Sequence, residues 1–360
     1  MVKMKKNILV VDDSALMRRV LCDIINADDR FEVVGEASNG EAALELLKQN
    51  AYDAVILDVN MPKMDGIQLL KELKKCGIKA RILMASTVTT HGAKITMEAL
   101  ELGALDFIHK PDWAYRCKTD EFSDHFLNLL DAVCKAKIIE TSQGSIKKAN
   151  ASREAIETIV RKNTQKITGK RIIALACSTG GPKALQSVVP NLPQDMKAPM
   201  VLVQHMPVGF TQSLASRLDS LSKVKVVEAA EGDVLEDGCV YVAKGGMHMN
   251  LVKKGMSTVV HYTDEPTREG VKPCANYMYE SLADSDYDEV VCVVLTGMGA
   301  DGTEGIAHLK EKKKTFVITQ NGETCVVNGM PKSVVNAGLS DETVPLPLIA
   351  QEIILHVGVK

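Results

Sequence analysis

The sequence lacks the features that would place it in a membrane, outside the cell or on nucleic acid. No apolar run approaches the length of a transmembrane helix. The apolar stretch behind the basic start stops at Asp12 and is too short for a signal peptide. The net charge of -3 gives no reason to expect nucleic acid or an acidic membrane as the main partner. We therefore expect neither a nucleic-acid partner nor membrane insertion.

The cysteines also argue against a disulfide framework or a zinc site. There are nine, an odd number, and no two of them form a C-x-x-C pair. This pattern is typical of reduced thiols in a cytoplasm, so we expect a cytoplasmic protein. No internal repeat of 20–50 residues indicates a solenoid.

The first part of the chain alternates short apolar runs with amphipathic stretches. With 360 residues, 46% of them apolar and 25% charged, the chain is long enough for two globular domains. Asn39 stands where a helix N-cap belongs. Five βα units predict a parallel sheet with helices on both faces. The runs are residues 7–11, 31–37, 54–57, 81–85 and 107–109.

The composition changes after this first α/β unit. Residues 139–168 are rich in Lys, Ser, Thr, Asn and Gln, which predicts a linker, with a helix over 153–163. Apolar runs then resume at 171–176, 200–204, 239–243, 290–295 and 315–319. The expected organisation is therefore a domain at 1–138, a linker at 139–168 and a second α/β domain at 169–360.

Acidic residues follow the predicted strands of the first domain. Asp12 and Asp13 come after the first run, Asp58 ends the third, and Lys110 follows the fifth. Strand ends of a parallel sheet share one crevice, so these side chains should converge. Three carboxylates there favour Mg²⁺, with Asp58 attacking a phosphoryl donor. Lys110 and the hydroxyl of Ser86 could pair with the phosphate. Each acid alone could instead be a loop residue or a helix cap.

This part of the sequence resembles a response-regulator receiver domain, a flavodoxin-like (βα)5 fold. The resemblance lies in Val10-Val11-Asp12-Asp13-Ser14, in the run from Leu57-Asp58 to Asp65-Gly66, and in His109-Lys110-Pro111. It implies a histidine kinase as phosphodonor. It also implies that Asp58 is the phospho-acceptor. The implied metal ligands are the carboxylates of Asp12, Asp13 and Asp58 and the backbone carbonyl of Asn60. The implied switch residues are Ser86, Phe107 and Lys110.

A second set of reactive residues follows strands of the rear domain. Ser178 lies in a tight turn with Gly180 and Gly181, where a helix start could bind an oxyanion. His205 ends the next run and could take the serine proton, and Asp301 could fix the imidazole tautomer. The set predicts nucleophilic hydrolysis.

Other interpretations of these residues remain open at this point. Ser178 could be an N-cap, His205 a hydrogen-bonded structural residue, and Asp301 the cap of the following helix. Cys177 is a rival nucleophile, although adjacent residues of a strand point to opposite faces.

The loop at residues 297–302 also has the G-x-G-x-x-G spacing of a dinucleotide site. Such a site needs an acid at the end of the next strand, and Gln320 stands there.

The rear domain resembles the chemotaxis protein-glutamate methylesterases. The matching motifs are Ser178-Thr179-Gly180-Gly181-Pro182, Gln204-His205-Met206-Pro207, Ala243-Lys244-Gly245-Gly246-Met247-His248-Met249, Thr296-Gly297-Met298-Gly299-Ala300-Asp301-Gly302 and Gly329-Met330-Pro331. The resemblance implies a Rossmann-like, mostly parallel sheet, a Ser178–His205–Asp301 triad, an oxyanion donor at Met298 and no cofactor at this site. It also implies chemoreceptors as substrates, with deamidation of their glutamines as a further activity.

The expected protein is therefore a phosphorylation-activated hydrolase of glutamate methyl esters in chemotaxis. The alternative is a non-catalytic regulator that binds a receptor when it is phosphorylated. The sequence departs from the family pattern at Ala176-Cys177, at Asn276, where an acid is expected, and in an insert at residues 112–120.

Overall fold

The computed structural model describes residues 4–86, 90–110, 120–138 and 169–359. The chain divides into two compact units, Met1–Ile138 and Ile139–Lys360. The predicted linker and its helix at 153–163 lie outside the described residues, as do residues 112–119 of the insert. Within the described parts, every helix is too short or too polar to cross a membrane.

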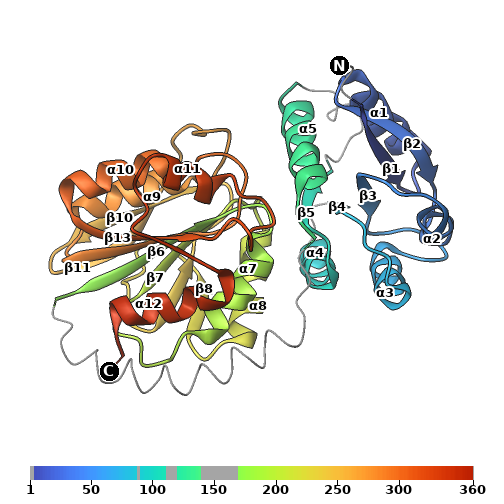
Figure 1. Cartoon of the computed structure of the whole chain (residues 1–360). Helices are drawn as coiled ribbons and strands as arrows, with labels where there is room; N and C mark the ends of the chain where they lie inside the picture. Colours follow the sequence, from blue (N-terminus) through green and yellow to red (C-terminus); the bar gives the residue numbers. More distant parts are fainter. Residues whose placement is uncertain (1–3, 87–89, 111–119, 139–168, 360) are drawn as a thin grey trace. The chain divides into compact units, whose positions relative to one another are not determined.

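The first unit is built on a parallel sheet in the order β2-β1-β3-β4-β5 (Figure 1). This confirms the predicted α/β fold of the first domain. Its strands are β1 (Lys6–Val11), β2 (Phe31–Ala37), β3 (Ala54–Asp58), β4 (Ile82–Ser86) and β5 (Asp106–His109). Its helices are α1 (Ala15–Ala27), α2 (Gly40–Gln49), α3 (Gly66–Cys76), α4 (Thr90–Leu102) and α5 (Asp120–Lys135).

Side-chain caps begin the helices that follow the first three strands. Ser14 accepts a hydrogen bond from the Met17 N–H at the start of α1, and Asn39 accepts one from Ala42 at the start of α2, which confirms the predicted cap. Asp65 and Gln68 form a capping box at the start of α3. These caps therefore fix the residues at which α1, α2 and α3 begin after their strands.

The second unit is a three-layer α/β structure around a sheet in the order β14-β13-β12-β6-β7-β9-β8. Within this seven-stranded sheet every pair of neighbouring strands among the described residues is parallel, in agreement with the mostly parallel sheet that we predicted, and the central strands are fully buried apolar runs. The strands are β6 (Arg171–Cys177), β7 (Met200–Gln204), β8 (Lys225–Glu228), β9 (Cys239–Val242), β12 (Glu289–Val294), β13 (Lys314–Gln320) and β14 (Glu342–Val344).

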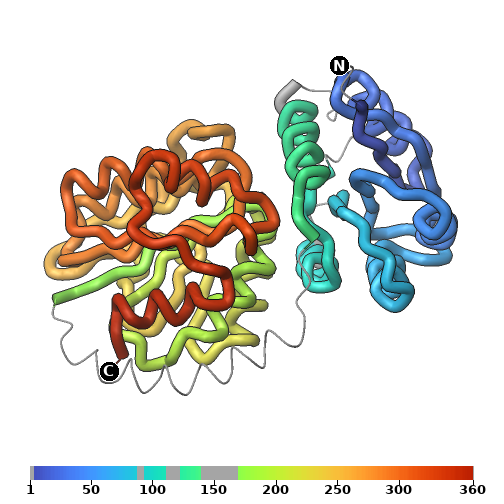
Figure 2. The backbone as a smooth tube through the Cα atoms, in the orientation of Figure 1, coloured from blue at the N-terminus to red at the C-terminus, as the bar shows by residue number. Residues whose placement is uncertain are grey.

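Helices cover both faces of this sheet. Helices α9 (Ala275–Ser281), α10 (Thr303–Lys312) and α11 (Met330–Asn336) lie on one face, and α7 (Gly181–Val188), α8 (Phe210–Leu221) and α12 (Ile349–Val357) on the other (Figure 1). Strand β12 lies beside β6 although the two are far apart in the sequence (Figure 2). An antiparallel hairpin of β10 (His248–Lys254) and β11 (Ser257–Thr263), which we did not predict, packs on α9.

Candidate functional site

Two neighbouring strands bring Ser178 and His205 to the same edge of the second sheet. Strands β6 and β7 are parallel, and their last register pair is Cys177 with Gln204. The His205 N–H continues this ladder and donates to the Cys177 carbonyl at 3.2 Å. Since adjacent strands lie about 4.8 Å apart, Ser178 and His205 leave the sheet side by side.

Ser178 occupies a tight turn between β6 and α7. Its N–H donates to the Thr296 carbonyl at 3.0 Å, and its own carbonyl accepts from the Gly181 N–H at 2.6 Å. Helix α7 has Gly180 as its N-cap, in the left-handed region at φ 77°, so Ser178 is not the cap. Among the described residues the half-buried Ser178 hydroxyl has no hydrogen-bond partner. It is therefore available for chemistry.

Asp301 reaches His205 from the loop after β12. The His205 Nε2 lies 2.7 Å from Asp301 Oδ2. Asp301 is only 2% exposed and accepts three further bonds at the start of α9, from the N–H groups of Ala275 (2.6 Å) and Asn276 (2.9 Å) and from the Cys274 thiol (3.0 Å). It does not cap α10, whose N-cap is Gly302.

These contacts fix the charge of Asp301 and the tautomer of His205. Burial alone would raise the pKa of Asp301, but the hydrogen bond and charge of His205 and the donors at Ala275 and Cys274 together lower it. A charged carboxylate must receive a proton from the imidazole, so the proton of a neutral ring lies on Nε2. Nδ1, with no partner among the described residues, is left as the acceptor.

Gln204 joins the loop that follows β6 to the loop that follows β7, a role that the sequence did not reveal. Its buried amide nitrogen donates to the carbonyls of Ser178 (3.1 Å) and His205 (3.2 Å). Its oxygen accepts from the Cys177 thiol at 3.1 Å. Cys177 is fully buried and burial raises its thiol pKa, so little thiolate forms and the residue is a poor rival nucleophile.

Glycine at position 297 lets the loop after β12 approach Ser178 closely. A Cβ at Gly297 would lie 2.8 Å from the Ser178 Cβ and would overlap the Met330 sulfur. The next residue, Met298, is half-buried, and its N–H has no partner among the described residues. The position and the free donor suit the oxyanion role that we expect for Met298.

Gln320 and His248 are structural residues. The Gln320 amide accepts from the Thr296 N–H at 2.8 Å and donates to the Thr324 carbonyl at 2.7 Å. Gln320, which stands where a dinucleotide site needs an acid, therefore binds Thr296, the residue whose carbonyl accepts from the Ser178 N–H. His248 is fully buried and both ring nitrogens are engaged, with the Cys274 N–H and the Pro266 carbonyl.

The acidic pocket of the first unit is assembled as expected. Carboxylate oxygens of Asp12, Asp13 and Asp58 lie within 4.8 Å of one another. The Lys110 ammonium lies 3.0 Å from Asp12 and 2.7 Å from Asp58. Asp12, Asp58 and Lys110 are buried, whereas Asp13 is exposed.

The charges of this pocket fit a divalent cation. Burial and the nearby charge of Asp12 raise the pKa of Asp58, and they outweigh Lys110, which lowers it. Burial would lower the pKa of Lys110, but Asp58 and Asp12 outweigh it and raise that pKa. One ammonium faces three acids, and carboxylate oxygens are the ligands that Mg²⁺ prefers.

The expected switch residues lie close to this pocket. Ser86 ends β4, is 1% exposed, and its hydroxyl accepts from Thr96 at 3.1 Å. Phe107, on the neighbouring strand β5, is 7% exposed and so points inward. Asn60 is exposed two residues after Asp58. This placement is compatible with the roles that we expect for them.

Two protein families match the chain. The model of the CheB methylesterase family matches residues 173–353, and that of the response regulator receiver domain matches residues 8–115. A protein-glutamate methylesterase/protein-glutamine glutaminase of Halalkalibacterium halodurans is 41% identical over 348 residues, which are 96% of this chain and 97% of that protein. The Bacillus subtilis protein of the same name is 38% identical, over 93% of this chain and 94% of its own length.

A solved structure agrees with the fold of the second unit. The CheB methylesterase catalytic domain of Thermotoga maritima is 40% identical to this chain. The two align with a TM-score of 0.50, over 52% of this chain and 98% of that domain.

Proposed function

The chain belongs to the CheB methylesterase family, and from this premise we propose that Ser178, His205 and Asp301 hydrolyse side-chain esters of glutamate. The protein is a protein-glutamate methylesterase of chemotaxis with a receiver domain in front of its hydrolase domain. Its substrates are γ-glutamyl methyl esters on chemoreceptors in the cytoplasm, and glutamine side chains are a second substrate class. Residues 1–138 form the receiver domain and 169–360 the catalytic domain.

The single observation that carries the proposal is the hydrogen bond between His205 and the buried Asp301, beside a Ser178 hydroxyl that has no partner among the described residues. In the first step the Ser178 oxygen attacks the ester carbonyl and His205 Nδ1 takes the serine proton. The tetrahedral oxyanion accepts a hydrogen bond from the Met298 N–H. The intermediate collapses as the ester C–O bond breaks and the leaving methoxy oxygen takes the proton from His205, so that methanol departs and an acyl-enzyme remains.

The second step reverses the roles around the acyl-enzyme. His205 takes a proton from water, and the hydroxide attacks the acyl carbonyl. The bond to the Ser178 oxygen breaks, the serine regains its proton from His205, and glutamate is released. Asp301 stabilises the imidazolium of both steps. The hydrogen bond between the Ser178 hydroxyl and His205 Nδ1 forms with the substrate in place, because catalytic hydrogen bonds often tighten only in the enzyme–substrate complex.

Asp58 is the phosphoryl acceptor of the receiver domain, and a histidine kinase supplies the phosphoryl group. Asp12, Asp13, Asp58 and the Asn60 carbonyl would hold Mg²⁺, which offsets negative charge on the transferred group. The phosphate adds a charge of about -1.5 to -2, which attracts Lys110 and the Ser86 hydroxyl. Movement of Ser86 leaves space for Phe107 and changes the adjoining surface.

Replacing Asp58 by Asn should abolish activation, since an amide is no nucleophile for phosphoryl transfer. Methanol release would be measured from methylated receptor membranes with and without acetyl phosphate and Mg²⁺. We expect the rate of Asp58→Asn to be the same in both conditions. Asp23→Asn, at an exposed position of α1, should keep the activation of the parent. Activation of Asp58→Asn equal to that of the parent would refute this assignment.

Asn276 should position Asp301, because its buried side chain ties the Asp301 loop to α9. Its oxygen accepts from the N–H groups of Gly302 (3.0 Å) and Gly305 (2.7 Å), and its nitrogen donates to Glu269 (3.0 Å). Asn276→Ala leaves two buried donors unpaired, which should lower the free energy of unfolding by about 1–3 kcal/mol. Denaturant unfolding measures this loss.

The conservative variant separates positioning from loss of fold. Asn276→Asp keeps both acceptor bonds, although it loses the donor to Glu269, and it should recover most of the kcat that Asn276→Ala loses at a temperature where both are folded. Equal kcat for all three proteins would mean that Asn276 has no effect on the triad.

Methanol release from methylated receptor membranes tests the function itself. The purified protein should release methanol and leave glutamate at the modified positions, faster with a phosphodonor. Receptor binding without methanol release in either condition would favour the non-catalytic regulator.

A further inference from the structure

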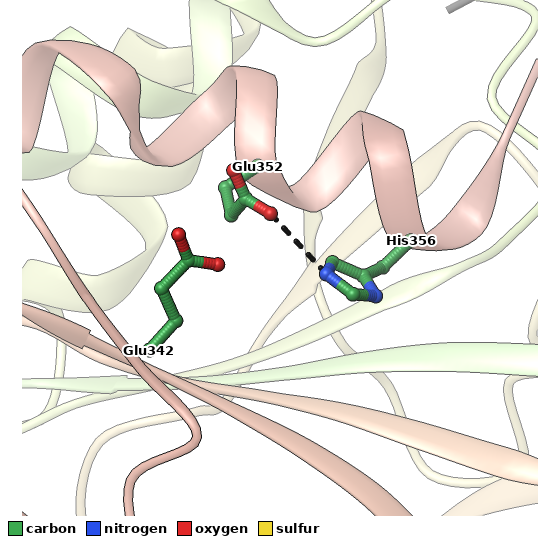
Figure 3. A group of neighbouring side chains, drawn as sticks. All are labelled: Glu342, Glu352 and His356. Carbon is green, nitrogen blue, oxygen red and sulfur yellow. Dashed lines mark ion pairs between the residues drawn. The ribbon is translucent and has the colours of Figure 1, made fainter. Parts of the chain in front are cut away.

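Three possible metal ligands of the second unit converge between the short strand β14 and helix α12. Glu342 begins β14, and Glu352 and His356 lie on α12 (Figure 3). Their carboxylate oxygens and an imidazole nitrogen lie within 4.8 Å of one another. Figure 3 shows the three side chains directed toward a common space between the strand and the helix.

The helix and the sheet hold this group in place. Glu352 and His356 are four residues apart and share one face of α12, where His356 Nε2 lies 3.2 Å from Glu352 Oε1. The imidazole stacks on Phe316 of β13 with ring centroids 3.7 Å apart. Arg171, the first residue of β6, donates to the His356 carbonyl. The ring is therefore oriented by packing as well as by its partner Glu352.

The charges around this group leave room for a cation. The cations Arg171 and Lys314 are engaged by Glu289, at 2.8 Å and 3.1 Å. Two carboxylates and one imidazole thus lie together, and both of these cations are already paired with Glu289.

We propose that Glu342, Glu352 and His356 bind a divalent cation of the zinc class. One imidazole nitrogen and two carboxylate oxygens are a donor set that Zn²⁺ accepts, at about 2.0–2.2 Å each. Ligand atoms already within 4.8 Å need only small side-chain movements to reach that geometry. The exposure of Glu342 provides an entry path, and water can fill a fourth position.

The position of the site indicates a structural role. Arg171 and Glu289 begin β6 and β12, so the end of α12 lies near the edge of the sheet where these strands start. Ser178 and His205 lie at the opposite edge, where strands end. A bound ion would join the short edge strand β14 to α12 and would stabilise this corner without touching the triad. The inference is therefore independent of the proposed hydrolase activity.

Competition between the full-length protein and a chromophoric chelator for Zn²⁺ tests the site, with excess Mg²⁺ present to fill the receiver pocket. His356→Gln and Glu342→Gln should each raise the Kd of one zinc ion at least about tenfold. His308→Gln is the matched control, because His308 is an exposed histidine of α10 outside this group. It should bind Zn²⁺ like the parent.

Two further readouts make the outcome decisive. Zinc should raise the melting temperature of the parent and of His308→Gln, but not that of His356→Gln. Crystals of the parent grown with zinc should give an anomalous peak between the three side chains. The proposal is overturned if the parent binds zinc no more tightly than His356→Gln, or if zinc-loaded crystals have no peak there.

Discussion

Ser178→Ala should lose methylesterase activity by a factor of about 10⁴ to 10⁶ in kcat, measured as methanol released from methylated receptor membranes. The reason is that alanine removes the hydroxyl that leaves the sheet beside His205, where β6 and β7 end side by side. The rate that remains reflects the oxyanion donor and substrate binding alone. The assay needs full-length protein and a saturating phosphodonor, so that activation does not limit the rate.

Two control variants separate the nucleophile from its surroundings. Ser187→Ala removes a serine of α7 whose hydroxyl bonds only to the Lys183 carbonyl among the described residues, and it should keep the parent rate. Cys177→Ala removes the buried rival thiol and should keep activity within about tenfold of the parent, a loss that weaker packing of Gln204 can explain. A Ser178→Ala protein with the parent rate, or an inactive Cys177→Ala protein that is folded, would contradict the assignment.

Asp301→Asn should lower kcat by about 10⁴-fold, because both orientations of the new amide disturb the site. Asp301 Oδ2 accepts from His205 and Ala275, and Oδ1 accepts from Asn276 and Cys274. An NH₂ group in place of Oδ2 would donate to His205 Nε2 and move the ring proton to Nδ1, which could then no longer take the serine proton. An NH₂ group in place of Oδ1 would face the Asn276 N–H and lose that bond.

Nitrogen-15 NMR of the imidazole provides a readout that misfolding alone would not produce. In the parent, His205 at neutral charge should carry its proton on Nε2, and in Asp301→Asn the Nδ1 tautomer should increase. Asp264→Asn is a suitable control, because Asp264 is an exposed aspartate that pairs with Lys272. It should change neither the rate nor the tautomer. An unchanged His205 tautomer together with an unchanged kcat in Asp301→Asn would remove Asp301 from the mechanism.

The parts of the fold that follow from local sequence pattern were predictable. Buried parallel strands are continuous apolar runs, so the central strands of both sheets could be recognised from composition alone. Because ligand sites of such sheets lie at the carboxyl ends of strands, Ser178 and His205 could be placed at one edge before their register was known. Asn39 was predictable as a cap because capping depends on near neighbours in sequence.

Elements that depend on distant contacts were not predictable. Strand β14 has three residues and exists because it pairs with β13. The β10–β11 hairpin is an exception, because Gly255, at φ 65° in its two-residue turn, is a local signal that could have revealed it. The same limit applies to the site. The Gln204 amide bridges two loops, and the backbone N–H groups of Ala275 and Asn276 hold Asp301 through contacts that no motif encodes. The cluster at Glu342 likewise needs a strand and a helix to meet.

Mass spectrometry after labelling with a fluorophosphonate tests the central claim most directly. The reagent modifies a serine only when a base activates its hydroxyl, so it reports on the pair of Ser178 and His205 without a receptor. The account predicts a stoichiometric adduct on Ser178 in the phosphorylated parent and almost none in a folded His205→Ala protein. An adduct on another residue, or equal labelling of Ser178 in both proteins, would contradict it.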